Sequence, residues 1–441
     1  MASFSEYGET FCVFPWVHAM TRPHGTMQPC CTSTVELKRD SGTPYYLWES
    51  SIADVWNSAH YREIRRQMLA GGKVAGCDWC YNLEKVKKRS YRQTSNDWWE
   101  RQNPNLIHAR VEQSRARDFF VEGDPVSLDL RLGNLCNLRC RSCHPTSSSQ
   151  LAEEWKGFIE KYPEFCNIWS GKFFDQPGGT PRDEIPAWYK AESFWQEIFR
   201  FLPEVKSIYI TGGEPTLLRG NYILLEKCVE AGYARDIELM LNTNLTTESA
   251  KFMGFLPHFK KVQLNCSIDA YGKQNEYLRY PSSWETTDRN MRAMLPLPAN
   301  VNISVNPVVQ FHNVLNLDVL LEYIEELNRE RATGKVFIET IILQMNPKWL
   351  EMGLLPQTVR ELAAARLRRF IAGSFLYRED AWSRMNLDSV LRVLEEAPDS
   401  ADREILQLNK RYTEIHDDAR SVRFRDYFPE LHGLLVEAGV Y

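Results

Sequence analysis

The sequence lacks the long apolar runs that place a chain in a membrane. No stretch approaches the roughly 20 consecutive apolar residues that a transmembrane helix needs. The first residues, MASFSEYGETFCVFPW, also lack the basic segment and the apolar segment of a secretory signal. We therefore expect a soluble, cytoplasmic protein that has no membrane partner.

An excess of charge of one sign is also missing. The chain has 53 Lys+Arg against 58 Asp+Glu, and its formal net charge is -5. Proteins that bind polyanions neutralise phosphates with Lys and Arg, so this balance does not favour nucleic acid as the partner, although a local basic patch stays open. There are no internal repeats or low-complexity tracts, and 441 residues predict about three units at roughly 150 residues each.

What the sequence does contain is 11 cysteines. An odd count in a long chain without a secretory signal is a poor fit to a disulfide framework and a better fit to metal or redox chemistry. Cys228 and Cys266 lie in apolar runs and are expected to be small buried side chains, whereas Cys166 stands alone. The other cysteines form two groups: Cys12, Cys30, Cys31, Cys77 and Cys80, and then Cys136, Cys140 and Cys143.

The second group has the spacing C-x3-C-x2-C, with Cys136, Cys140 and Cys143 in one short loop. Three thiols this close cannot reach different partners, which favours a metal site. A structural zinc ion needs a fourth ligand, and His144 is adjacent in sequence, which usually points it away. Three cysteines that hold three irons of a [4Fe-4S] cluster and leave the fourth iron open need no further protein ligand.

The loop follows a predicted strand. VSLDLRLGN alternates in hydrophobicity before Cys136, and a second strand, VKSIYI, runs into Thr211-Gly212-Gly213-Glu214-Pro215. We count six strands, each but the last followed by a helical segment, which predicts a parallel α/β sheet of barrel-like or open form. Functional groups in such sheets gather at the carboxyl ends of the strands, where Asn242-Thr243-Asn244 and Ser267-Ile268-Asp269 also lie.

The cysteine spacing and Gly212-Gly213-Glu214-Pro215, on successive strand ends, resemble the radical S-adenosylmethionine (SAM) superfamily over about residues 124–345. The resemblance implies a partial (β/α)6 barrel whose three cysteines hold a [4Fe-4S] cluster, with SAM bound to the open iron through its amino and carboxylate groups. Reduction of the cluster would cleave SAM to a 5'-deoxyadenosyl radical, which takes a hydrogen atom from the substrate.

The same resemblance implies contacts to SAM. Two glycines let backbone approach a ligand and Glu214 can accept hydrogen bonds from an ammonium, so residues 212–215 (Gly212, Gly213, Glu214 and Pro215) would bind the amino end of SAM. The alternative for this segment is an ordinary strand-to-helix turn.

Four further residues are assigned with it. Ser267 and Arg279 are spaced like the pair that family members use on the SAM carboxylate, and Asn244 and Asp269 are placed to reach the ribose or the substrate. For these residues, strand-end capping and a surface charge remain the alternative.

The first cysteine group has another pattern. Cys12 and Cys30 are single thiols, and Cys77-Asp78-Trp79-Cys80 is a C-x2-C knuckle, which together supply four ligands for zinc or for a [4Fe-4S] cluster. Two short extended runs flank a turn signal at Gly25. This arrangement is similar to the Twitch domain, the shortened SPASM domain that holds one auxiliary [4Fe-4S] cluster; the matching residues are Cys12, Gly25, Cys30, Trp56, Arg65, Cys77 and Cys80.

One departure from that pattern is clear, because the domain usually follows the barrel and here precedes it. We assign Cys30 rather than Cys31 as a ligand, from its spacing after Gly25. The predicted organisation is an auxiliary-cluster domain at 1–95, a linker at 96–123, a radical SAM barrel at 124–345 and a helical C-terminal cap at 346–441. Residues 144–200 form an insertion that is either a lid or a hydrophobic flap.

The function predicted by this resemblance is that of a radical SAM oxidoreductase supplied by an electron donor such as flavodoxin or ferredoxin. Relatives with the auxiliary domain mostly modify ribosomally made peptides or proteins, and some oxidise small sugar-like alcohols. A peptide or protein substrate therefore ranks first, ahead of a sugar-like alcohol dehydrogenase or epimerase. An RNA-modifying radical SAM enzyme and a non-catalytic iron-sulfur or zinc protein remain as alternatives. The catalytic residue is not identified.

Overall fold

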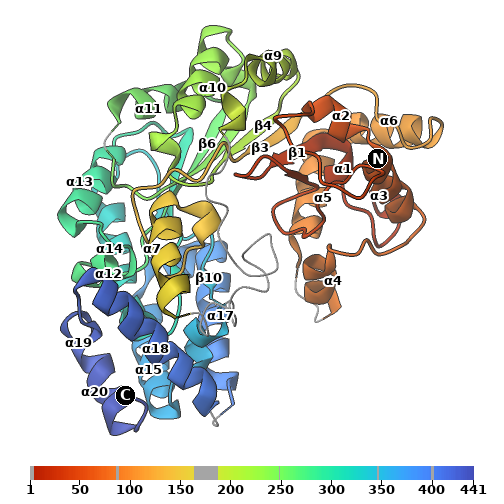
Figure 1. Ribbon diagram of the computed structural model, residues 1–441. Helices are drawn as coiled ribbons and strands as arrows, with labels where there is room; N and C mark the ends of the chain where they lie inside the picture. The colour runs from red at the N-terminus through yellow and green to blue at the C-terminus, as the bar shows by residue number, and fades with distance from the viewer. Residues whose placement is uncertain (1–3, 86–88, 163–186, 248, 345–346, 399–401) are drawn as a thin grey trace. The chain divides into compact units, whose positions relative to one another are not determined.

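The computed structural model describes residues 4–85, 89–162, 187–247, 249–344, 347–398 and 402–441 (Figure 1). Cys166 and part of the predicted insertion lie outside these residues. The chain forms two compact units. Unit 1 contains Met1–Asn134, Asp183–Met240 and His258–Lys260, and unit 2 contains Leu135–Arg182, Leu241–Pro257 and Lys261–Tyr441.

Unit 1 contains four neighbouring strands in the order β2-β1-β3-β4. Strand β1 (His18–Thr21) pairs antiparallel with β2 (Met27–Gln28) and parallel with β3 (Ser127–Leu130), which pairs parallel with β4 (Ser207–Ile210). The sequence predicts all four extended segments. It does not predict that β1 joins the sheet of β3, because a pairing across about a hundred residues leaves no local pattern.

The turn between β1 and β2 requires glycine. Gly25 has φ +80°, and a Cβ there would lie 3.0 Å from side-chain atoms of both Trp188 and Trp48. The indole nitrogen of Trp188 donates to the carbonyl of Pro23 at 2.9 Å. Two aromatic rings therefore close over this turn, and any larger residue would meet both backbone strain and a steric clash.

Helices surround these strands. The segment 96–123, assigned above as a linker, is largely helical and buries Trp99, Ile107 and Val111. The helical elements of unit 1 are η1 (Phe4–Tyr7), α1 (Phe14–Val17), α2 (Ile52–Trp56), α3 (Ala59–Leu69), α4 (Asp78–Lys85), α5 (Tyr91–Gln102), α6 (Pro104–Arg115), η3 (Trp188–Lys190), α9 (Glu192–Phe201), η4 (Pro215–Leu217), α10 (Arg219–Glu230) and η5 (Ala234–Asp236).

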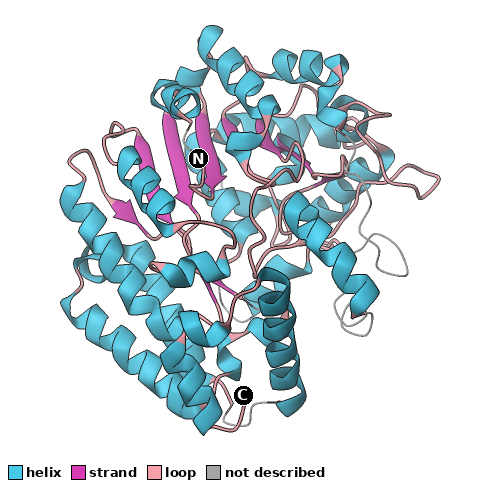
Figure 2. Cartoon of the chain, turned by 60° about the vertical axis from the view of Figure 1, so that its left-hand side comes forward, coloured by secondary structure: helices cyan, strands magenta, loops and turns pink. Residues whose placement is uncertain are grey.

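Unit 2 continues the alternation of strands and helices, shown in magenta and cyan in Figure 2. Strand β5 (Glu238–Thr243) runs from one unit into the other along the chain. Strands β6 (Lys261–Cys266), β7 (Val301–Val305) and β9 (Val336–Phe337) are parallel neighbours, and β8 (Val308–Val309) pairs parallel with β10 (Ile342–Leu343). The predicted mixed α/β fold with parallel strands is confirmed, and the side chains of Cys228 and Cys266 are fully buried as expected.

The C-terminal region is helical, as predicted. None of the helices in the described ranges is both long and apolar enough to cross a membrane. The helical elements of unit 2 are η2 (Pro145–Ser147), α7 (Ser149–Lys161), α11 (Ala250–Phe255), α12 (Lys273–Leu278), α13 (Trp284–Met294), η7 (Val314–Asn316), α14 (Leu317–Glu330), η8 (Lys348–Leu350), η9 (Met352–Leu354), α15 (Gln357–Gly373), α16 (Phe375–Glu379), α17 (Ala381–Glu396), α18 (Arg403–Arg420), α19 (Phe424–Tyr427) and α20 (Pro429–Glu437), and η6 (Leu256–His258) lies where the units divide.

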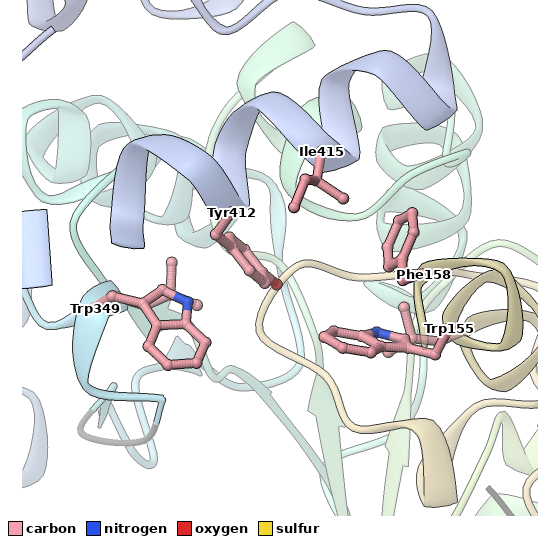
Figure 3. Close-up of a cluster of buried hydrophobic side chains, with 7 residues drawn as sticks. Trp155, Phe158, Trp349, Tyr412 and Ile415 are labelled. Carbon is pink, nitrogen blue, oxygen red and sulfur yellow. The ribbon is translucent and has the colours of Figure 1, made fainter. Parts of the chain in front are cut away.

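A buried cluster joins α7 to α18 and η8 (Figure 3). The rings of Trp155 and Phe158 from α7 meet edge to face with centroids 5.5 Å apart, and Trp349 lies 6.0 Å from Tyr412 of α18. Aromatic side chains of this size bury large apolar areas, so this cluster attaches the helix that follows the Cys136 loop to the C-terminal helices.

We expect Trp155→Ala to lower the free energy of unfolding by about 3–5 kcal/mol, because it removes a fully buried indole and leaves a cavity. Urea denaturation followed by circular dichroism would measure the loss. Trp382 of α17 is 50% exposed, so Trp382→Ala serves as the control and should stay within about 0.5 kcal/mol of the parent. Equal losses in the two variants would contradict the assigned packing.

Candidate functional site

The backbone of the Cys136–Cys143 loop is attached to the end of α12. The N–H of Arg139 donates to the carbonyl of Tyr280 at 2.6 Å, and the N–H of Arg141 donates to the carbonyl of Leu278 at 2.8 Å. These bonds lie on either side of Cys140, so the middle cysteine of the loop is fixed from both directions.

Polar side chains that follow strand β5 and helix α12 reach the sulfur atoms of this loop. Asn244, just beyond β5, places Nδ2 3.9 Å from Sγ of Cys136. Arg279, just beyond α12, places Nη1 3.7 Å from Sγ of Cys140. Weak N–H···S contacts of this kind stabilise a thiolate, so two residues predicted from the sequence lie at the cysteines rather than elsewhere on the sheet.

Asp269 lies beside Arg279, the residue that contacts Cys140. Its Oδ2 lies 2.9 Å from Nε of Arg279, and its Oδ1 accepts a hydrogen bond from the N–H of Val308 at 2.8 Å. Both charged side chains are buried, with exposures of 1% for Asp269 and 8% for Arg279. Ser267, at the end of β6, donates its N–H to the carbonyl of Thr243 at 2.9 Å, and its side chain is partly exposed.

The three thiols lie close enough to influence one another. Burial raises the pKa of Cys140; the positive charge of Arg279 opposes this, and Cys143 and Cys136 raise it further. Burial and then Cys136 raise the pKa of Cys143 to about 11. Thiols in such a group give up their protons together only when a cation balances the charge, so this donor set fits a metal cluster.

A buried ion pair supports the loop from the C-terminal helix. Arg141 is fully buried, and its Nη2 lies 2.5 Å from Oδ1 of Asp417 on α18. Tyr277 donates its hydroxyl to the same carboxylate oxygen at 2.7 Å, and its ring centre lies 3.8 Å from the guanidinium carbon. Tyr412 donates its hydroxyl to the carbonyl of Arg141. These contacts add hydrogen bonds and an aromatic ring to the buried ion pair, while Nη1 of Arg141 has no hydrogen-bond partner among the described residues.

A second charged group, formed by Glu154, Arg420 and Arg139, lies beside the ion pair of Arg141 and Asp417. Glu154 of α7 accepts from Nε and Nη2 of Arg420 at 2.9 and 2.7 Å, and lies 3.5 Å from Nη1 of Arg139. The two guanidinium groups lie over the ring of Tyr280, at 5.4 and 5.0 Å from its centre. No sequence pattern indicates this pairing, because Glu154 and Arg420 are separated by 266 positions.

The glycine-rich turn lies in unit 1. Gly212 has φ +127°, and a Cβ there would lie 2.8 Å from the carbonyl oxygen of Gly133. The N–H of Gly213 donates to the same carbonyl at 3.2 Å. Glu214 is buried, and its Oε1 accepts from the N–H and hydroxyl of Thr216 at 3.2 and 2.7 Å. Gly212 therefore has a steric requirement for glycine, and Glu214 caps the short helix η4 that begins at Pro215.

A second set of thiols surrounds one cavity of unit 1. Cys12, Cys30, Cys77 and Cys80 all line it, together with Tyr81 and Arg92 among other residues. They come from the segment before α1, from the loop after β2, and from the start of α4. The structure thus brings together the four predicted auxiliary ligands, which are distant in sequence.

The same charge argument applies to this cavity. Burial, then Cys30 and Cys77, raise the pKa of the Cys12 thiol. Burial and then Cys30 raise the pKa of Cys77 to about 12. No three His, Cys, Asp or Glu side chains among the described residues are arranged around a single metal ion. Four soft donors in one buried cavity are nevertheless the complete protein ligand set of a [4Fe-4S] cluster.

Cys31 faces a different environment. Burial, then Cys30 and Asp129, raise its pKa to about 12, while Arg131 and the hydroxyl of Tyr91 oppose the increase. Asp129 of β3 and Arg131, just beyond this strand, form a two-point ion pair with distances of 3.1 and 3.0 Å. The sequence does show these two charges at alternate positions of an apolar strand, a signal that a polar group faces one side of the sheet.

Two further residues of the auxiliary pattern have structural roles. Arg65 is fully buried and donates from Nε to the carbonyl of Pro15 and from Nη2 to that of Trp56, both at 2.7 Å. Its guanidinium also lies over the Trp56 ring, 4.8 Å from the centre. Arg65 and Trp56 therefore fix helix α1, which follows directly after Cys12.

Two family models match the chain. The model of the radical SAM superfamily matches residues 130–310, and the model of an iron-sulfur cluster-binding domain, SPASM, matches residues 12–82. The first range includes the Cys136–Cys143 loop and the 212–215 turn, and the second includes all four cavity cysteines. No curated protein matches the chain in sequence.

Solved structures show weaker similarity. SuiB of Streptococcus suis is 13% identical, with a TM-score of 0.36; the alignment covers 68% of this chain and 56% of SuiB. The protein anSMEcpe with bound AdoMet is 18% identical, with a TM-score of 0.36, and the alignment covers 57% of this chain and 62% of that one. The chain thus spans less than two thirds of either protein.

We expect Cys30→Ala to remove the metal of the auxiliary cavity and Cys31→Ala to leave it in place, because only the first thiol lines the cavity. After anaerobic reconstitution, iron analysis should give about four irons per chain for Cys30→Ala and about eight for Cys31→Ala. The two neighbouring substitutions are matched in size and chemistry. About eight irons in Cys30→Ala and about four in Cys31→Ala would show that Cys31, not Cys30, is the ligand.

We expect Asp417→Ala to destabilise unit 2 by about 3–5 kcal/mol, because it leaves the buried guanidinium of Arg141 without its counter-charge. Urea denaturation of the metal-free protein would measure this. Asp418 is 64% exposed and pairs with Arg423, so Asp418→Ala is the control and should cost at most about 1 kcal/mol. A loss of similar size in the control would argue against the buried pair.

The fold, the two cysteine groups and the family models agree. Parallel strands alternate with helices, a C-x3-C-x2-C loop follows β3, and a four-cysteine cavity lies in the range of the SPASM model. The chain therefore carries a radical SAM domain and, ahead of it, a SPASM iron-sulfur cluster-binding domain.

Proposed function

We propose that this chain is a radical SAM oxidoreductase that acts on a peptide or protein. The observation that carries the proposal is the loop of Cys136, Cys140 and Cys143, with Asn244 and Arg279 directed at its sulfur atoms, inside the range of the radical SAM model. When bound there, a reduced [4Fe-4S] cluster would supply the electron that cleaves SAM to the 5'-deoxyadenosyl radical, which abstracts a hydrogen atom from the substrate.

The chain's own groups would bind and orient SAM. We assign its amino end to the turn of Gly212, Gly213, Glu214 and Pro215, in which Gly212 has a φ of +127° that favours glycine. Ser267 at the end of β6 is assigned to the SAM carboxylate. Asn244 contacts Cys136 and Asp269 pairs with Arg279, and these contacts support a role at the cluster in place of the alternative role at the ribose or the substrate.

We propose that the cavity cysteines hold the auxiliary cluster as an electron acceptor. Cys12, Cys30, Cys77 and Cys80 offer one thiol for each of four irons, so the chain supplies a full ligand set and needs no substrate atom to complete it. This favours electron transfer over direct binding of the substrate to the cluster. Electrons for the radical SAM cluster would come from a donor such as flavodoxin or ferredoxin.

The choice of a peptide or protein rests on the SPASM match, since relatives with this domain mostly modify peptides. SuiB has been crystallised with its precursor peptide SuiA and anSMEcpe with a peptide. A small sugar-like alcohol is the competing substrate. The net charge of -5 gives no support to RNA, which binds through Lys and Arg.

The test is iron content together with SAM cleavage. Anaerobically reconstituted protein should hold about eight irons, and the Cys136→Ala, Cys140→Ala, Cys143→Ala triple variant about four. With dithionite and SAM, the parent should release 5'-deoxyadenosine and the triple variant should not. Cys228→Ala, which removes a buried thiol outside both groups, is the control and should behave as the parent does. A fully loaded parent that releases no 5'-deoxyadenosine would favour a non-catalytic iron-sulfur protein.

A further inference from the structure

We infer that Arg279, held by Asp269, raises the reduction potential of the cluster bound by Cys136, Cys140 and Cys143 by placing a positive charge against the sulfur of Cys140. The inference rests on the proposed function, because it requires a cluster on these cysteines. It assigns Arg279 and Asp269 to the cluster itself rather than to the SAM carboxylate or the ribose.

The guanidinium of Arg279 contacts both the sulfur of Cys140 and the carboxylate of Asp269. Nη1 lies 3.7 Å from Sγ of Cys140, Nε lies 2.9 Å from Oδ2 of Asp269, and Nη2 lies 3.4 Å from Oδ1 of the same carboxylate. Nη1 and Nη2 therefore make hydrogen-bond contacts within the chain, and Nε forms the ion pair with the carboxylate. The side chain is fixed with one edge toward the carboxylate and one nitrogen toward the sulfur.

Hydrogen bonds to both its backbone and its side chain hold Asp269 in place. Its Oδ1 accepts the N–H of Val308 at 2.8 Å, its own N–H donates to Oδ1 of Asn275 at 3.0 Å, and its carbonyl accepts from Nδ2 of Asn313 at 2.8 Å. Backbone and side chain are thus held by β8 and by two asparagines. A carboxylate held in this way fixes the direction in which the guanidinium points.

Burial strengthens the interaction between the positive charge of Arg279 and the sulfur of Cys140. Asp269, Arg279 and Cys140 have exposures of 1%, 8% and 8%, so little water screens the interaction. Reduction adds one negative charge to a cluster, and hydrogen bonds to its sulfurs together with nearby charge are what set its potential. A guanidinium in contact with one ligand sulfur favours the reduced form, and the carboxylate on its other side moderates that effect.

Two substitutions should therefore act in opposite directions. Arg279→Gln removes the positive charge and should lower the ratio of reduced to oxidised cluster about tenfold at a fixed potential, which is 59 mV for a one-electron couple. Asp269→Asn keeps an oxygen for the N–H of Val308 but removes the negative charge, so it should raise that ratio. A role limited to folding predicts no such opposition.

The measurement is a redox titration of the reconstituted full-length protein, followed by electron paramagnetic resonance in the absence of SAM. The signal of this cluster is the one that the Cys136, Cys140, Cys143 triple alanine variant loses, and the signal of the auxiliary cluster is the internal reference. Arg292→Gln is the matched control, since Arg292 pairs with Asp288, Glu326 and Glu330 on α13 and α14. It should leave both potentials unchanged.

Unchanged potentials in Arg279→Gln and Asp269→Asn, or shifts in the same direction, would overturn the inference. If Arg279→Gln fails to hold the cluster, Asp269→Asn and Arg279→Lys decide: the first should raise the potential, and the second, which keeps the charge, should stay within about threefold of the parent ratio. A parent protein that shows no signal dependent on the three cysteines would instead refute the proposed function.

Discussion

The ion pair between Arg141 and Asp417 is the interaction on which the cysteine loop of unit 2 depends. Removing two charges from water is costly unless further hydrogen bonds satisfy them. Here the carboxylate also receives the hydroxyl of Tyr277 and the N–H of Phe424, and the guanidinium lies against an aromatic ring. The pair is therefore part of a buried hydrogen-bond network, and it fixes the residue between the second and third cysteines of the loop.

The two cysteine groups are surrounded by different chemistry. The Cys136–Cys143 loop has a guanidinium and an amide directed at its sulfurs, and a further charged group of Glu154 with Arg139 and Arg420 nearby. The auxiliary cavity is walled largely by apolar and aromatic side chains, with Arg92 as its charged residue among those that line it. Net charge and hydrogen bonds around a cluster control its potential, so these surroundings suit clusters of different potential.

Much of this was predictable from local sequence. The six strands have clear alternation or apolar runs, Gly25 and Gly212 are at positions where a side chain would clash, and the four cavity thiols were selected by their spacing. The strands and turns depend mainly on residues close together in the chain, where propensity and turn chemistry act, whereas the four thiols are distant in sequence and are indicated by the resemblance to the Twitch domain. The assignment of Cys30 rather than Cys31 as a ligand also depends on a local feature, the spacing after Gly25.

What the sequence did not predict depends on contacts over long separations. The pairing of β1 with β3, the helices between residues 96 and 123 that bury Trp99 and Ile107, and the support of the cysteine loop by α18 all arise from packing. The contacts of Arg279 are also not predictable from the local sequence. Spacing marked it as a functional residue, but only the position of Asp269 shows that its guanidinium is directed to a ligand sulfur.

The separation of Arg141 and Asp417 also has a consequence for the synthesis of the protein. A ribosome makes Arg141 and the three cysteines around it 276 residues before it makes Asp417. Until helix α18 has emerged, the loop lacks the counter-charge that stabilises its buried arginine. The order of translation therefore places the completion of this cluster loop after nearly the whole chain has been made, whereas the cavity of Cys12 to Cys80 can close early.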